Sequence, residues 1–188
     1  TAYPSRRVWL HVVVRDRDGR AIFESGALTP QGEIVGNDND ADPKRYEPHY
    51  AEINGRGQVQ IYESVMADAT GAPTTGLLRG VRYLKDNRLL PHGFDKSTAS
   101  DDIAVVGAAA GDGDFVSGGD RVRYVVELGE AQGPYHVEAA LWYQPISFRW
   151  AKNLEAYEAP EPLRFTRYYR SMADSSAVLL TRSSRSAR

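Results

Sequence analysis

A chain of 188 residues lies within the size range of one domain, and its hydrophobic content of 41% is sufficient to build a core. A formal net charge of -2 leaves no basic field for nucleic-acid binding, and the apolar runs are too short to span a bilayer. The absence of cysteine excludes disulfides, thiolate catalysis and covalent haem attachment through Cys-x-x-Cys-His in this chain.

Alternating apolar and polar residues predict β-strands along most of the chain. The run from residue 8 to residue 15 has two distinct faces, and Asp18-Gly19 predicts a tight turn into a second strand over residues 20–24. Further strands are expected over residues 58–66, 78–85, 121–128 and 135–143. Residues 129–134 are predicted to join the last two of these strands as a hairpin.

Antiparallel sheets with one wet face bury their apolar faces most simply against each other. We therefore predict one mainly β domain over residues 1–180, an antiparallel β-sandwich with one or two short C-terminal α-helices. Helical spacing of apolar residues places these helices within about residues 146–175, separated near Pro160 and Pro162. The Ser- and Arg-rich end, residues 181–188, lacks periodicity and is predicted to be a disordered tail.

The loop over residues 36–43 combines several Asn and Asp residues in one short stretch. Crowded carboxylate and amide oxygens are what a calcium ion requires, so this loop is a candidate calcium site. An EF-hand is excluded, because Pro43 stands at the position of its turn glycine and His49 at that of its bidentate glutamate. The alternative is that these side chains cap helices and hold turns through hydrogen bonds to the backbone. The candidate ligands are Asp38, Asn39, Asp40 and Asp42.

His49 is the histidine with the strongest functional signal, because it lies in a predicted loop beside Glu47 and two tyrosines. None of the four histidines has a zinc-ligand spacing such as His-x-x-x-His. The chain also lacks a Gly-x-Ser-x-Gly elbow and a phosphate-binding glycine loop, and we expect this domain to have no catalytic apparatus of its own. One alternative is an enzyme whose site is assembled in the folded protein from His49 and the carboxylates of Glu47, Glu52 and Glu63.

The glycine-rich run over residues 107–119 resembles a phosphate loop in composition only, because no helix signal follows it. We predict a long hairpin loop in which Asp112 and Asp114 are solvated acids. Cation binding by these two carboxylates is the alternative.

Several aromatic and polar runs carry a resemblance to a known family. They are residues 3–12 (YPSRRVWLHV), 23–26 (FESG), 36–40 (GNDND), 46–50 (YEPHY), 58–63 (QVQIYE), 82–91 (RYLKDNRLLP) and 93–96 (GFDK). Together they resemble the region that follows the haem-binding part of bacterial multihaem c-type cytochromes. The resemblance covers the chain from residue 1 to about residue 177.

The resemblance implies an exported, periplasmic protein, since c-type haem is attached outside the cytoplasm. It implies that haem c belongs to the upstream part of a longer polypeptide, and the abrupt strand at Val8 fits a fragment that lacks that part. This chain would then be an accessory, non-catalytic domain that supports electron transfer by packing on the haem domain or docking a redox partner. His49 would lie near a haem of the parent protein. The alternative is a calcium-stabilised, carbohydrate-type binding module that uses the 36–43 loop and surface aromatic residues.

Overall fold

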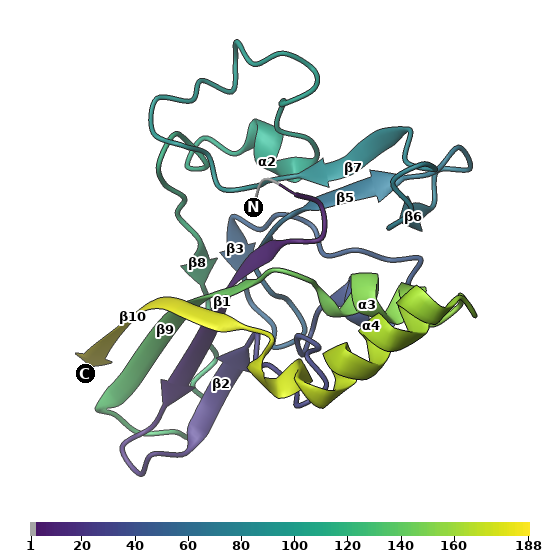
Figure 1. Cartoon of the computed structure of the whole chain (residues 1–188). Coiled ribbons are helices and arrows are strands. Elements are labelled where there is room, and N and C mark those ends of the chain that lie inside the picture. Colours follow the sequence, from purple (N-terminus) through teal and green to yellow (C-terminus); the bar gives the residue numbers. More distant parts are fainter. Residues whose placement is uncertain (1–2) are drawn as a thin grey trace.

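The computed structural model describes residues 3–188, and residues 1 and 2 of the predicted domain lie outside the described part (Figure 1). The strands are β1 (Arg7–Arg15), β2 (Ala21–Ser25), β3 (Glu52–Ile53), β4 (Ile61–Tyr62), β5 (Ser64–Ala67), β6 (Pro73–Thr74), β7 (Arg82–Asp86), β8 (Arg123–Tyr124), β9 (Tyr135–Gln144) and β10 (Val178–Ala187). The helices are α1 (Asp38–Ala41), α2 (Ala108–Gly111), α3 (Phe148–Leu154) and α4 (Pro160–Ser171), with a 3₁₀ turn at Ala173–Ser175. The predicted fold class, mainly β with antiparallel sheets and short C-terminal helices, is confirmed.

The main sheet has the strand order β10-β9-β1-β2, and the short β4 also pairs with β1. All of these pairings are antiparallel. The turn between β1 and β2 lies at the predicted Asp18-Gly19, where Gly19 adopts φ of 78°, a conformation that favours glycine. A second sheet contains β5, β6 and β7, and β3 pairs with β8 in parallel.

The alternating side chains of β1 fill two different cores. Trp9 is completely buried in a cluster with Ile34, Val59 and Ile61, and its indole N–H donates to the carbonyl of Gly26. On the opposite face, Val8 and Val14 belong to two further clusters, which residues from the loops and from β3 and β8 complete. The side chains of β1 are therefore mostly buried on both faces of the strand, which explains why apolar residues occur on both sides of its alternation.

Two expectations from the sequence are corrected by the pairing of the strands. Residues 129–134 do not form a hairpin between neighbouring strands, because β9 lies between β1 and β10 while β8 pairs with β3. The predicted disordered tail over residues 181–188 forms most of β10, which pairs along β9 from Tyr135 to Tyr143. All side chains of β10 are exposed, so its sequence has no need to alternate and gives no strand signal.

The C-terminal helices agree with the helical spacing expected over residues 146–175. Pro160 begins α4, in the first turn where a missing backbone N–H costs nothing. From α3, the guanidinium of Arg149 donates to the backbone carbonyls of Asn39 and Asp40, which ties the helix to the 36–43 loop. Within residues 3–188, no helix is long and apolar enough to cross a membrane.

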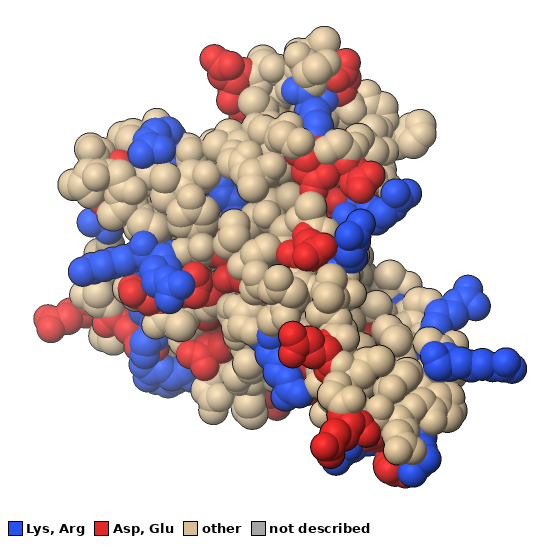
Figure 2. Space-filling view, turned by 180° about the vertical axis from the view of Figure 1, so that it is seen from behind, with Lys and Arg blue, Asp and Glu red and all other residues tan. Residues whose placement is uncertain are grey.

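The long segment between β7 and β8 lies with the second sheet at one end of the molecule, opposite the β1–β2 turn (Figure 1). It contains α2 and delivers Asp112 and Asp120 to the neighbourhood of the main sheet. On the face seen in Figure 2, basic and acidic residues are interspersed, as the near-neutral net charge suggests.

Candidate functional site

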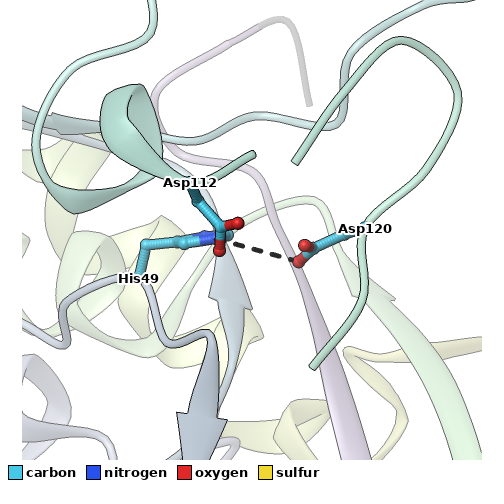
Figure 3. A group of neighbouring side chains, drawn as sticks. All are labelled: His49, Asp112 and Asp120. Atoms are coloured by element: carbon cyan, nitrogen blue, oxygen red, sulfur yellow. Dashed lines mark hydrogen bonds and ion pairs between the residues drawn. The ribbon is translucent and has the colours of Figure 1, made fainter. Parts of the chain in front are cut away.

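His49 is buried with 6% of its surface exposed, in the segment that leads into β3. Its ring lies 5.0 Å from the ring of Phe115 and 6.3 Å from that of Tyr62, measured between centroids. Phe115 follows α2 and Tyr62 belongs to β4, so the imidazole fills a space between the main sheet and the long β7–β8 segment. Figure 3 shows His49 meeting Asp112 and Asp120, which both come from the β7–β8 segment.

Two buried amides fix the protonation state of His49. The side-chain N–H groups of Gln60 and Asn87 approach its Nδ1 at 2.8 Å and 2.9 Å. Neither amide can be turned around, because the Gln60 oxygen accepts from the N–H of Tyr50 and the Asn87 oxygen from that of Glu63. Nδ1 is therefore an acceptor, and the proton of the neutral imidazole must lie on Nε2.

The Nε2–H of His49 points at acidic side chains. It donates to Oδ2 of Asp112 over 3.2 Å, and Oδ2 of Asp120 lies 3.9 Å from the same nitrogen. Burial lowers the pKa of His49, and this outweighs the opposite effect of the two carboxylates. Burial acts to raise the pKa of Asp112, but hydrogen bonds from the backbone N–H of Asp114 and from His49 lower it overall. The pair is a neutral histidine donating to an ionised aspartate.

His49, Asp112 and Asp120 also form a group whose ligand atoms lie within 4.8 Å of one another, as in a metal site. The amides behind the ring argue against that function. A metal on Nε2 would move the imidazole proton to Nδ1, where two amide N–H groups already point at the nitrogen. The arrangement fits a hydrogen-bonded network and does not fit a metal ion.

Asp120 is the least satisfied member of this network. Its side chain is 4% exposed, and its Oδ2 accepts from the hydroxyl of Tyr62 at 2.6 Å and from Gln60 at 3.1 Å. Its Oδ1 has no hydrogen-bond partner, and neither has the buried hydroxyl of Tyr124. Proximity to Asp120 contributes, after burial, to the raised pKa of Tyr124, so the two groups interact electrostatically.

Asp120 and Tyr124 both line an apolar groove with a volume of about 700 Å³. One wall comes from β1 and β9, and the other from the segment around β8. The polar residues of the lining are Asp120, three tyrosines and Arg188. The aliphatic residues of the groove are Leu10, Val12, Val14, Leu89, Val122, Val126, Leu128, Val137, Ala139, Leu141 and Ala187.

The 36–43 loop uses most of its polar side chains to hold its own structure. Asn37 caps α1 by accepting from the N–H of Asn39. The carboxylate of Asp40 is buried, accepting from Arg7 at 2.8 Å and from the N–H of Ile34. Around it, Asp38 pairs with Arg45, the amide of Asn39 donates to the carbonyl of Arg45, and Asp42 accepts from the N–H of Lys44. Calcium binding by Asp38, Asn39, Asp40 and Asp42 stays a prediction.

The carboxylates of the enzyme hypothesis serve separate local partners. Glu47 accepts from two backbone N–H groups and from the hydroxyl of Tyr50, and burial raises its pKa. Glu63 pairs with the buried Lys85 at 3.2 Å. Glu52 is exposed on β3, 3.5 Å from an arginine. Their hydrogen bonds hold the fold, and none of these contacts joins a carboxylate to His49.

Sequence reasoning identified His49 as a candidate but did not identify most of its partners. It weighed Asp112 as a solvated loop acid or a cation ligand, whereas the carboxylate is paired with His49. It missed Gln60, Asn87 and Asp120. The available signal was Gln60, a polar residue between the apolar Val59 and Ile61 in a predicted strand. A completely buried amide requires a specific partner.

Comparison with known proteins gives little further information. No family profile matches the chain, and no curated protein matches it. Among solved structures, a penta-heme cytochrome c552 from Thermochromatium tepidum is similar, with 16% sequence identity and a TM-score of 0.45. The match covers 100% of this chain and 32% of the cytochrome chain, so this chain spans about a third of that protein. A similarity at this level assigns neither a family nor a function.

Proposed function

We propose that this chain is an accessory, non-catalytic domain of an exported multihaem cytochrome. It would support electron transfer by packing on the haem-bearing part of the same polypeptide. The observation that carries the proposal is the apolar groove between the main sheet and the segment around β8. The identity of the partner rests on the sequence runs, such as GNDND at residues 36–40, that resemble multihaem cytochromes.

The groove has the properties of a binding surface. Its floor consists of aliphatic side chains from two central strands, and at its rim Leu128 is 42% and Leu89 40% exposed. An apolar concavity that remains in contact with water is stabilised when another surface covers it. Because its floor belongs to the main sheet, a partner seated there would contact a rigid part of the domain.

The site around His49 supports binding more than catalysis. A general acid or base must reach the proton that it transfers, whereas His49 is buried and both of its ring nitrogens are engaged. Axial ligation of a haem by His49 would likewise cost these hydrogen bonds. We propose that His49 acts through its hydrogen-bond network, which holds the wall of the groove in place. Its proximity to a haem of the parent protein remains part of the proposal.

The test is association between this chain and the separately produced haem-bearing part at high micromolar concentrations, where weak domain contacts are measurable. Leu128→Asp places a charge at the rim of the groove and should weaken association by at least about ten-fold. The matched control is Leu78→Asp, because Leu78 is fully exposed and lies outside the groove. Absence of association, or an equal effect of both substitutions, would contradict the proposal.

A further inference from the structure

The C-terminal strand β10 forms one edge of the main sheet (Figure 1). It pairs with β9 on one side, and no other strand among residues 3–188 pairs with its opposite side. Every second residue of such an edge strand directs its backbone N–H and C=O groups away from the sheet. With ten residues, β10 is also long compared with β2, the five-residue strand at the other edge. It therefore presents an extended row of backbone donors and acceptors.

Both faces of β10 are as open as its outer edge. All ten of its side chains are exposed, and the first three of them are the apolar Val178, Leu179 and Leu180. Side chains on neighbouring strands pack beside one another on each face of a sheet. A segment that pairs with this edge would therefore gain side-chain contacts with β10 on either face.

The charge of β10 is entirely basic. The strand contains Arg182 and Arg185 and has no Asp or Glu. Neither guanidinium has an ion-pair or hydrogen-bond partner within residues 3–188. A second copy of this chain would bring the same cations together along the edge, and like charges on neighbouring strands destabilise their pairing. The edge thus favours an acidic partner over a second copy.

The register of β10 determines where the acids of such a partner must lie. Arg182 lies opposite Ala140 on β9. Arg185 lies opposite Val137, three positions away from Ala140. Directly opposed residues share a face of the sheet, and successive residues alternate between faces, so the two arginines project on opposite faces. A strand paired with β10 would meet both cations with two acids that are likewise three positions apart.

We propose that the outer edge of β10 binds an extended acidic segment of another polypeptide, which adds a strand to the main sheet. The segment carries two carboxylates in the spacing acid-x-x-acid, one for Arg182 and one for Arg185, and apolar residues beside residues 178–180. In this mode of recognition the main-chain hydrogen bonds provide affinity and the side chains provide specificity. The inference goes beyond the proposed function, because the apolar floor of the groove belongs to β1 and β9.

Titration with short peptides, followed by NMR of the backbone amides of the protein, tests the proposal. The probe is acetyl-Glu-Thr-Thr-Glu-Val-Thr-Val-Thr-amide. The control peptide, acetyl-Glu-Thr-Glu-Thr-Val-Thr-Val-Thr-amide, has the same composition but both acids on one face. The probe should shift the signals of residues 178–187 and bind at least about three-fold more tightly than the control. Absence of binding, equal binding of the two peptides, or shifts confined to other residues would overturn the proposal.

Removing both cations should abolish the preference for the probe. Arg182→Gln combined with Arg185→Gln changes only exposed side chains, so the fold should persist. This variant should bind the probe at least about five-fold less tightly and should no longer distinguish it from the control peptide. Arg164→Gln combined with Arg167→Gln removes the same charge from exposed positions of α4 and should leave binding unchanged. An equal loss in the two variants would mean that binding follows net charge alone, which contradicts the proposal.

N-methylation of the probe tests the backbone pairing. One form carries methyl groups on alternate residues and a second form on the remaining ones, so each form loses the N–H groups along one of its edges. The form whose methyl groups face β10 should lose clearly more affinity than the other, whereas equal affinities would show that no strand is added. Sedimentation of the native chain tests the choice of occupant. The chain should remain monomeric, and a dimer that pairs through β10 would contradict the proposal.

Discussion

His49 and Asp112 are 63 residues apart in the chain, yet the imidazole Nε2–H donates to the carboxylate Oδ2 over 3.2 Å. On the other side of the same ring, Nδ1 accepts from Asn87, at the end of β7, and from Gln60, beside β4. One side chain therefore joins the main sheet, the second sheet and the long β7–β8 segment. A buried hydrogen-bond network stabilises a protein only when all of its groups are satisfied. Removal of the His49 side chain should therefore lower the free energy of unfolding.

Replacing His49 by leucine should destabilise the fold strongly. The substitution keeps a similar volume but leaves one N–H of Gln60 and one of Asn87 without an acceptor, at about 1–3 kcal/mol each. We expect a loss of about 2–6 kcal/mol in the free energy of unfolding, measured with urea. The control is His11→Leu, because His11 and its partner Glu24 are both partly exposed. A similar loss in both variants would mean that the buried network of His49 stabilises the fold no more than an exposed histidine–glutamate pair does.

The contribution of His49 to the stability of the protein should fall as the pH is lowered from 7 towards 5. Burial lowers the pKa of His49 from its ordinary value of 6.5, so the unfolded chain takes up the proton first. The contribution of His49 is complete above pH 6.5 and is lost as the pH falls towards the folded-state pKa, with a slope of up to about 1.4 kcal/mol per pH unit. Urea unfolding of the native protein and of His49→Leu at several pH values measures this slope as the difference between the two.

The variant His49→Leu also isolates the pH effect. Asp112 has a lowered pKa too, but an ordinary carboxyl value of 3.8 places its contribution at lower pH. The difference in stability between the native protein and the variant should therefore shrink between pH 7 and pH 5, because only His49 is absent from the variant. A difference that is constant over this range would show that His49 does not titrate as its burial predicts.

Local patterns predicted the parts of the fold that local physics determines. The β1–β2 hairpin followed from alternation on both sides of Asp18-Gly19, and α4 begins at a proline that suits a first turn. The pairing of β8 with β3 could not be predicted in this way. It depends on contacts between residues far apart in sequence, which override the short connection between residues 124 and 135.

The sequence indicated His49 as a site residue and drew attention to Asp112, but it did not show that these two side chains meet. His49 stood out because a histidine beside Glu47 and tyrosines is unusual in a loop. Asp120 and Asn87 gave no signal, since acids and amides in loops are mostly solvated and only the tertiary fold buries these two. The length of the β7–β8 segment was the indirect clue, because long connections are often functional.

Breaking the ion pair of Lys85 and Glu63 should destabilise the second sheet. Lys85 is buried, and burial lowers its pKa while Glu63 counteracts this. Lys85→Met leaves the partly buried carboxylate without its cation, and we expect a loss of about 3–5 kcal/mol, measured by urea unfolding. Adding Glu63→Leu should recover much of that loss. The exposed pair of Arg123 and Glu52 is the control, and Arg123→Met should cost less than about 1 kcal/mol.

Calcium binding by the 36–43 loop is tested by melting with calcium and with a chelator. Because Asp40 is already paired with Arg7, any ion must compete with internal donors and should bind weakly. At a concentration of calcium about ten-fold above the dissociation constant, the expected stabilisation is about 1.4 kcal/mol. Asp38→Asn should reduce it, since Asp38 is a predicted ligand on the surface side of the loop. An unchanged midpoint removes the calcium hypothesis.

Removing β10 should leave the protein folded but cause it to self-associate. All side chains of this strand are exposed, so its main contribution is the ladder of backbone hydrogen bonds that covers the edge of β9. Without it, β9 becomes an uncovered edge that can pair with another chain. A chain ending at Ala177 should sediment partly as dimers or larger species, whereas Arg185→Ser, which keeps the ladder, should remain unchanged. A truncated chain that stays monomeric would show that β9 is protected in another way.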